Sequence, residues 1–499
     1  MTYDELLKEY HQFKAQTAAL IRENSSLKSQ LSQMQAQISM LNRMLFGKRS
    51  EKLGRDENVN QIPLFDIPQP TAPEAEKTQM VSYERKETGK KKGHGRNELP
   101  ENLPVLERII EPEGDISGLK RIGQETRDIL ELEPARFYIL RLIRPKYADP
   151  VSERIIIAPM PHLPIPRGIP GPKLLAHIYT GKFVDHLPLD RQQKQYERLG
   201  VKLPSSTING WVNLGGKAII SQIYELYRQR ICQKTYLQLD ETPTKVQTDE
   251  IKGKLHRGYF WLYYSPLDGE IFYDYQSGRG RDGPKAILDG FQGWLQSDGF
   301  SVYDWFGKQE GIRQVHCMAH ARRLFYNLLA DNNDQRVQPI LELIKKLYKV
   351  EKEARHHQYT HDQRLAVRQK KSVPVLEEIK SWLAETLKEL TPSDPLAGAI
   401  GYMQTRWKTL TVFTEEGLLE IDNNPVENKV KPIPLGRKNW LFHGNEEAAK
   451  TAAMAYTLVA QAQNAGLNPQ DYLTYLFSHF WDHPHHDLKA LLPQNVKIE

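Results

Sequence analysis

The chain has 499 residues, of which 39% are hydrophobic and 26% charged, which excludes a wholly disordered protein and predicts about three to four domains. It has no run of about 18 apolar residues that would predict a membrane span, and its polar first residues do not fit a signal peptide. The two cysteines exclude a disulfide framework and favour a reducing cytoplasm. A net charge of +6 hints at a polyanionic partner, so two classes stay open: a nucleic-acid enzyme, or a DNA-binding or scaffold protein without chemistry.

The first 50 residues carry a seven-residue apolar repeat. One set of positions comprises Leu6, Phe13, Leu20, Leu27, Met34 and Leu41, and a second set follows it four residues later. Alternating spacings of four and three place one apolar seam on a helix, which is the coiled-coil pattern. We therefore predict that residues 1–50 form a coiled coil that joins copies of the chain. The alternative is an amphipathic helix packed within its own chain.

A linker and a basic arm are predicted over residues 51–98. Four prolines between Gln61 and Lys77 indicate an extended linker. The arm that follows is interrupted by glycines, and its candidate DNA-binding residues are Lys90, Lys91, Lys92 and Arg96. A flexible cationic arm suits contacts to DNA phosphates, although a charge run exposed to solvent gives the same pattern. A small module is predicted over residues 99–160.

Residues 161–230 are predicted to form a helix-turn-helix-like DNA-binding region. Helical patterns cover Lys173–Gly181 and Asp185–Leu199, with Pro188 near the start of the second and Gly200 just past its end. Another helix is expected after the turn, from Ser205. A brief turn between two helices fits helix-turn-helix geometry, but any helical hairpin would look the same.

The segment 231–460 is predicted to be an α/β domain with a mixed sheet. Three strands are expected first, at 236–240, 258–264 and 271–275, and then helices alternate with strands at 294–298 and 312–316. This order predicts an antiparallel meander at one edge of the sheet. A charged, helix-forming stretch at about 330–405 is expected to be a helical insertion, and residues 461–499 a helical tail.

Two of these strands are expected to end in an aspartate, Asp240 and Asp298. If the strands are adjacent, the carboxylates repel each other unless a cation lies between them, and hard oxygen ligands select Mg²⁺. Aspartates at strand ends are also common turn residues. A third acid, Glu427, lies in the first turn of a helix expected to have Asn424 as its N-cap, with Lys431 four residues later; Glu415, Glu416, Glu420 and Asp422 compete with it by composition.

A basic and aromatic stretch, 436–444, follows the third acid. It contains Arg437, Lys438 and Trp440. Such residues can hold a DNA backbone or a flipped base, and they can equally well pack at a helix end.

Together these motifs resemble the insertion-sequence-sixty-six transposases, over nearly the whole chain. The resemblance rests on Leu239-Asp240-Glu241-Thr242, Ser297-Asp298-Gly299 with Tyr303, His316-Cys-Met-Ala-His320-Ala-Arg322-Arg323, Ile421-Asp-Asn-Asn-Pro-Val-Glu427 and Leu435-Gly-Arg-Lys-Asn-Trp-Leu-Phe442. These transposases are DDE enzymes with an RNase H-like core. The resemblance implies that Asp240, Asp298 and Glu427 bind two Mg²⁺ ions, or Mn²⁺, and are catalytic.

The resemblance also implies the reaction and its partners. The enzymes bind the terminal inverted repeats of a mobile element, cut one strand, and join the freed 3′-hydroxyl to target DNA. Homo-oligomers bring two DNA ends together, and small companion proteins of the element can take part. We therefore expect a bacterial, nucleoid-associated protein. The alternatives are a catalytically inactive or domesticated DNA-binding regulator, and an RNase H-like nuclease without strand transfer.

The chain departs from the resemblance in three places. No cysteine lies between Leu99 and Pro150, so the zinc module usual there has no thiolate ligands, and no zinc is expected. Asn428-Lys429 stands where an arginine is frequent. His316, Cys317 and His320 look like a metal cluster, but a structural or DNA-facing role beside Arg322 and Arg323 is expected instead.

Overall fold

The computed structural model covers the chain in several stretches. The predicted coiled coil apart from residues 16–17, the basic arm with its four candidate residues and most of the cysteine-free module lie outside the described residues. From the module, the structure describes strands β1 (Lys146–Ala148) and β2 (Ile155–Ile157), which pair antiparallel. The described residues are 16–17, 137–140, 146–148, 155–157, 162–166, 168–248, 253–483 and 485–498.

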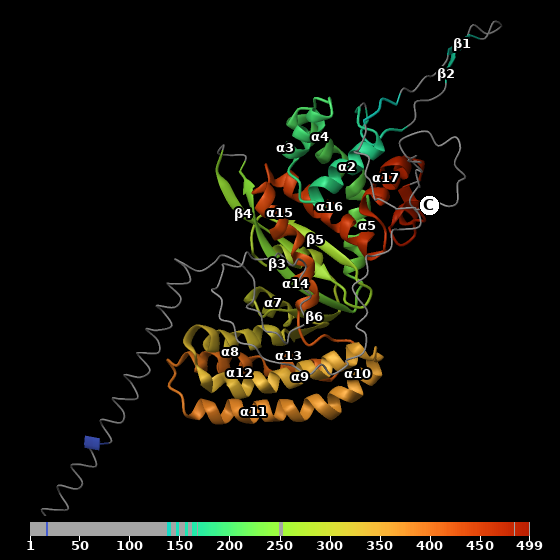
Figure 1. The fold of residues 1–499 in the computed structure, drawn as a ribbon. Coiled ribbons are helices and arrows are strands. Elements are labelled where there is room, and N and C mark those ends of the chain that lie inside the picture. Colours follow the sequence, from blue (N-terminus) through green and yellow to red (C-terminus); the bar gives the residue numbers. More distant parts are fainter. Residues whose placement is uncertain are drawn as a thin grey trace, which may run out of the picture. The chain divides into compact units, whose positions relative to one another are not determined.

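A five-stranded mixed sheet lies at the centre of the domain that follows (Figure 1). Its strands are β3 (Tyr236–Gln247), β4 (Leu255–Tyr264), β5 (Ile271–Gln276), β6 (Gly293–Ser297) and β7 (Ile312–His316). The spatial order is β5-β4-β3-β6-β7. Strands β3, β4 and β5 form the predicted antiparallel meander, whereas β6 and β7 run parallel to β3. All five predicted strands are present.

Several strand boundaries differ from the prediction. Strand β4 begins three residues earlier, β6 ends at Ser297 so that Asp298 follows it, and β3 continues seven residues past Asp240. Beyond the acid, Thr242, Thr244 and Val246 are buried in alternation with exposed Pro243 and Lys245, and this whole stretch pairs with β4. The parallel pairing with β6 nevertheless stops at Gln238. Asp240 therefore lies inside a strand on its β4 side and just beyond the end of the ladder on its β6 side.

Short helices connect the parallel strands, and longer ones pack on the sheet. Helix α6 (Asp282–Ile287) precedes β6, and α7 (Ser301–Phe306) lies between β6 and β7. Helix α16 (Glu446–Asn464) lies along β5, where Thr457 accepts a hydrogen bond from the Tyr273 amide and Gln461 donates one to the Ile271 carbonyl. This side-chain pairing fixes α16 to the meander edge of the sheet (Figure 1).

Helices also precede the sheet in the segment 161–230. They are α2 (Pro172–Phe183), α3 (Leu189–Arg198), α4 (Ser205–Gly215) and α5 (Ser221–Ile231), with one π-helical turn joining the last two. Helix α3 starts four residues later than predicted, because Pro188 is its extended N-cap. The tail contains α17 (Pro469–His479) and short 3₁₀ turns.

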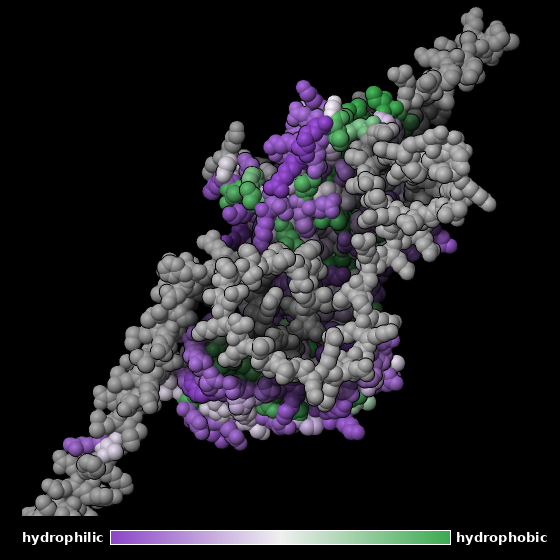
Figure 2. All heavy atoms as spheres, in the orientation of Figure 1, coloured by the Kyte–Doolittle hydropathy of each residue, from purple (hydrophilic) through white to green (hydrophobic). Residues whose placement is uncertain are grey.

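A layer of helices occupies the chain between β7 and the third acid. It comprises α8 (Met318–Asn332), α9 (Gln338–His356), α10 (His361–Val367), α11 (Val373–Lys388), α12 (Pro395–Thr405) and α13 (Trp407–Thr411). Its apolar core is continuous with Tyr236, Trp294 and Val315 of the sheet. On the face in Figure 2, hydrophilic residues predominate over this layer, with small apolar patches among them. Among the described residues, no helix has the length and apolar character to cross a membrane.

A buried ion network ties the helical layer together. Glu351 is fully buried and accepts hydrogen bonds of 2.6–3.0 Å from Arg364 and Arg368. Arg368, also fully buried, donates to the main-chain carbonyls of Phe413, Glu416 and Leu419. Burial raises the pKa of Glu351, but the two guanidinium groups outweigh it and leave the pKa lowered.

Replacing Glu351 should destabilise this domain strongly. Glu351→Gln leaves the buried Arg368 guanidinium without a countercharge, which typically costs about 3–5 kcal/mol, while Arg364 keeps Glu420 at 2.7 Å. The exposed pair Lys345–Glu342, 3.2 Å apart, provides the control: Glu342→Gln should cost less than about 1 kcal/mol. Urea denaturation of both variants measures the difference.

The difference should also depend on pH. Because the folded-state pKa of Glu351 is lowered, its stabilisation is complete above the unfolded pKa and is lost as the pH falls through the folded pKa. The difference in free energy of unfolding between the parent and Glu351→Gln should therefore become smaller as the pH falls. Equal stabilities of the two proteins at neutral pH would contradict this account.

Candidate active site

The register of the parallel strands places Asp240 beside Asp298. Gln238 pairs with Gln296, and their side chains are hydrogen-bonded at 2.8 Å. Two residues further along each strand, and on the same face, come Asp240 and Asp298. Adjacent strands lie about 4.8 Å apart, so the two carboxylates are neighbours at the edge where the β3–β6 ladder ends.

The chain turns away immediately after Asp298. Gly299 has φ of +91°, which L side chains rarely adopt, and a Cβ there would lie 2.6 Å from the Tyr402 hydroxyl oxygen. The Asp298 carboxylate accepts a hydrogen bond from the Phe300 amide at 2.9 Å, and Tyr402 donates to the Asp298 carbonyl at 3.0 Å. The Asp-Gly pair thus ends the strand and fixes the acid at its tip.

The third acid reaches this edge because the loop before its helix is attached to β3. The Asn423 side-chain amide donates to the Leu239 carbonyl at 2.7 Å, and Gln238 donates to the Asp422 carbonyl at 3.0 Å. Asn423 is fully buried, and its main-chain amide donates to Cys317 Sγ at 3.2 Å. Glu427 follows in the first turn of α14 (Asn424–Val430).

The predicted N-cap of this helix was displaced by one residue. Helix α14 begins at Asn424, and the N-cap is Asn423, whose side chain makes no cap hydrogen bond. The displacement arises because the Asn423 amide is used to bind β3, while Asp422 accepts from the Asn424 main-chain amide instead. The cap position is therefore used to attach the loop to β3.

The three acids lie close enough together for their charges to affect one another. Burial raises the pKa of Asp240 well above its usual value, and the charges of Glu241, Glu427 and Asp298 raise it further. Burial also raises the pKa of Glu427, with Arg323 opposing the shift and Asp298 adding to it. All three side chains stay partly open to solvent.

This site fits a divalent cation. Three clustered carboxylates supply hard oxygen ligands, and a bound cation would relieve their mutual repulsion. Glu427 Oε1 is buried and has no hydrogen-bond partner among the described residues. Asp240, Asp298 and Glu427 are thus candidate ligands for Mg²⁺ or Mn²⁺, whereas the described residues that bring three possible ligand atoms within 4.8 Å of one another are Cys317, His320 and Glu427.

A second buried acid beside Asp240 was not singled out from the sequence. Glu241, whose side chain is 3% exposed, accepts hydrogen bonds from Arg279 and from the Tyr303 hydroxyl. The Arg279 guanidinium also lies over the Phe300 ring, 3.9 Å from its centroid. Glu241 therefore has protein partners for its charge and braces β3 against the turn after Asp298. Glu241 and Tyr303 both belong to motifs quoted from the sequence, but nothing in the sequence indicated their contact with each other or with Arg279.

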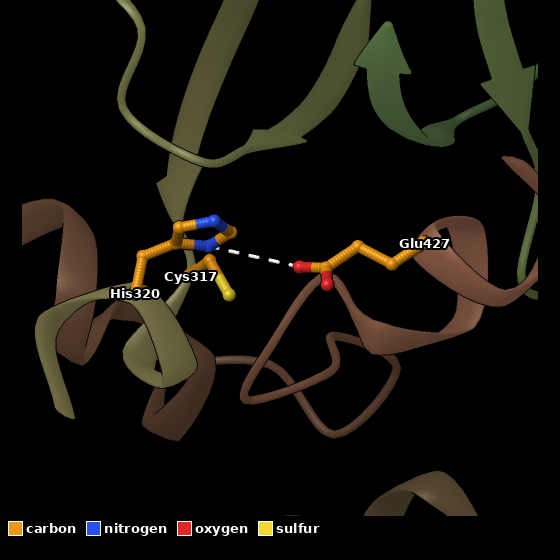
Figure 3. Close-up of side chains that lie close together, drawn as sticks. All are labelled: Cys317, His320 and Glu427. Atoms are coloured by element: carbon orange, nitrogen blue, oxygen red, sulfur yellow. Dashed lines mark ion pairs between the residues drawn. The ribbon is translucent and has the colours of Figure 1, made fainter. Parts of the chain in front are cut away.

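Cys317, His320 and Glu427 also gather into a small cluster (Figure 3). One possible ligand atom from each lies within 4.8 Å of the others. The Arg323 Nη1 lies 3.3 Å from His320 Nε2, and a guanidinium can only donate, so Nε2 must accept. The proton of the neutral ring is then on Nδ1, which faces Glu427 Oε1 at 3.7 Å.

That tautomer leaves no lone pair on His320 Nδ1 for a metal. Burial and the charge of Arg323 both lower the pKa of His320, which favours the neutral ring. The His320 N–H thus faces Glu427 Oε1 at a distance too long for a hydrogen bond, and the contact between them is electrostatic. His316 lies apart from this cluster, between the Thr409 hydroxyl at 2.6 Å and the Asp304 carboxylate at 3.2 Å.

The basic candidates occupy different surroundings. Arg323 lies 3.8 Å from Glu427, and Arg322 stacks over Tyr326. Lys431, between α14 and α15 (Pro432–Trp440), is exposed and donates to Asn428. Arg437 donates to the Pro243 carbonyl of β3, and Lys438 is exposed.

Trp440 is partly buried and packs against His443, with ring centroids 4.5 Å apart. Within the stretch 436–444, Trp440 and the buried His443 turn toward the protein, whereas Leu441 and Phe442 are exposed.

Comparison with known proteins identifies the family. The model of the "Transposase IS66 family" matches residues 167–451, and a model described as "Transposase C of IS166 homeodomain" matches residues 33–108. Similar proteins of Sinorhizobium fredii (strain NBRC 101917 / NGR234) include "Uncharacterized protein y4jD", 28% identical over 93% of this chain and 95% of its own length. Another, "Uncharacterized protein y4qI", is 29% identical over 97% of this chain and 92% of its own length. The first family match spans more than half of the chain, and the protein therefore belongs to the Transposase IS66 family.

Proposed function

We propose that this protein is a DDE transposase that binds the terminal inverted repeats of an insertion sequence and catalyses Mg²⁺-dependent strand cleavage and strand transfer. The observation that carries the proposal is the meeting of Asp240, Asp298 and Glu427 at one sheet edge, from three segments far apart in sequence. An antiparallel meander followed by two parallel strands, with acids beside the ladder's end, supports an RNase H-like core.

In this proposal the three carboxylates hold the metal ions, and the other residues keep them in place. When bound, the ions activate a water or a 3′-hydroxyl and stabilise the leaving oxygen of the phosphodiester. Asn423 holds the start of α14 on β3, His320 and Arg323 orient the Glu427 carboxylate, and Glu241 braces the strand. Both chemical steps use the same site.

DNA contact is proposed for several parts of the chain. The homeodomain match covers the basic arm with Lys90, Lys91, Lys92 and Arg96, and supports a DNA-binding role there. Helices α2–α4 are the proposed helix-turn-helix-like reader. Nearer the acids, Arg322, Arg323, Lys431, Arg437 and Lys438 are proposed to contact the backbone. Association through the coiled coil would bring two DNA ends together.

Removing one carboxylate should separate cleavage from binding. Asp240→Asn keeps the shape of the side chain but weakens cation binding, so Mg²⁺-dependent nicking of DNA from the ends of the flanking genomic sequence should fall by at least about 10³-fold. Affinity for the same DNA should change less than about threefold. The exposed Asp289→Asn is the matched control and should nick like the parent.

The same assay distinguishes the alternative functions. Binding without nicking by the parent protein would select a DNA-binding regulator. Nicking without joining of a 3′-hydroxyl end to a second DNA would select a nuclease. Either result would overturn the proposed transposase activity.

Asn423 should act as a positioning residue. Asn423→Ala removes the hydrogen bond to the Leu239 carbonyl, so α14 can shift, and a shift of about 1 Å in a reacting group can cost about 10²-fold in rate. We expect the nicking rate to fall about 10- to 100-fold, with DNA affinity unchanged. Single-turnover nicking, normalised to the folded fraction, measures this.

The control is Asn495→Ala, which removes an exposed side-chain hydrogen bond to the Lys489 carbonyl. It should leave the rate unchanged. A rate for Asn423→Ala equal to that of this control would show that the attachment of α14 to β3 is not needed for chemistry.

A further inference from the structure

We infer that Leu441 and Phe442 form an apolar wedge that enters the base stack of bound DNA several base pairs from the acidic site. The inference rests on the proposed function, since it takes DNA as the occupant. Both residues lie between α15 and α16, and they are 62% and 42% exposed. Two adjacent large apolar side chains that face solvent close to cationic residues indicate an interaction site.

The backbone of this wedge has an unfavourable conformation. Leu441 has φ of +65° and ψ of −48°, although it carries a branched side chain. Such conformations persist only where the surrounding structure enforces them, and they cluster at functional sites. Here the conformation ends α15 and holds the Leu441 side chain outward.

The surroundings that enforce the conformation are well defined. His443 is buried, its main-chain amide donates to the Lys245 carbonyl, and its carbonyl accepts from the Gln247 amide, both at 2.9 Å. On the other side, the Trp440 ring packs on His443 and lies over Gly436, where a Cβ would come 2.5 Å from its Nε1. The wedge is therefore fixed to β3 at one end and to α15 at the other.

The charge around the wedge selects nucleic acid as the partner. Helices α14 and α15 and the residue between them carry Lys429, Lys431, Arg437 and Lys438 against the single acid Glu427. On the other flank, the two acids that begin α16 have partners of their own, Glu446 with His256 at 2.8 Å and Glu447 with Lys450 at 3.0 Å. Arg437 also donates to the Pro243 carbonyl, three residues from Asp240 on β3, so this cation lies between the acid and the point where the wedge is attached. Cations that hold a backbone beside an apolar side chain that unstacks bases form a known mode of DNA binding.

The strand gives the distance between wedge and acids. The wedge is attached at Lys245 and Gln247, five and seven residues beyond Asp240 along β3. At about 3.3 Å per residue this is roughly 17–23 Å. Duplex DNA rises about 3.4 Å per base pair, so the distortion should lie about five to seven base pairs from the cleaved phosphate.

Fluorescence of 2-aminopurine tests the wedge, because the base brightens when it is unstacked. Duplexes from the element's end, each with one 2-aminopurine at a different position along the terminal repeat, are bound to the full chain without Mg²⁺. We expect the parent to raise the fluorescence several-fold at one or two positions five to seven base pairs from the nick. The double variant Leu441→Ser with Phe442→Ser should lose this rise and keep its DNA affinity within about threefold.

Leu267→Ser, which changes another exposed leucine, is the control and should behave like the parent. The wedge proposal would be wrong if the parent raised the 2-aminopurine fluorescence at no particular position, or if the double variant raised it at the same positions as the parent. Nicking of the same DNA is followed in parallel with Mg²⁺. Nicking with a flat profile refutes the wedge alone, whereas localised unstacking without any nicking supports the wedge and refutes the proposed function.

Discussion

The candidate site depends on one attachment, that of the loop before α14 to the middle of the sheet. Asn423 and Gln238 form the two hydrogen bonds that join this loop to β3, across 184 residues of sequence. Met318, at the start of α8, donates to the Ile421 carbonyl and holds the same loop from the other side. Without these bonds the helical layer could pack on itself, but Glu427 would have no fixed place beside Asp240.

The site combines charges of both signs at short range. Asp240 has a raised pKa because it is buried among other acids, while Glu241 next to it is paired with Arg279 and Tyr303. Glu241 therefore has protein partners for its charge, whereas the proposed metal ligand Asp240 is surrounded by other acids. Arg437 donates to the Pro243 carbonyl three residues further along β3, which suits the proposed polyanionic partner.

Much of the sheet could be predicted because each strand has a local pattern. Alternation marks β3, and Asp298-Gly299 marks the end of β6. The position of Asp240 inside β3 could not be predicted from the sequence, because pairing with β4 extends the strand on one side only. The local sequence pattern also left five acids as candidates for the third metal ligand, and only the resemblance pointed to Glu427. The inward turn of Trp440 depends on His443 binding β3, a contact that no local pattern reveals.

The most direct test of the three-acid site is the position of a bound metal. Crystals of the full chain with terminal-repeat DNA and Mn²⁺ would reveal the ions by their anomalous scattering. The account predicts peaks at roughly 2.0–2.2 Å from carboxylate oxygens of Asp240, Asp298 and Glu427, with His320 outside the coordination shell. Peaks bound to Cys317 and His320, or no peak between the two aspartates, would contradict it.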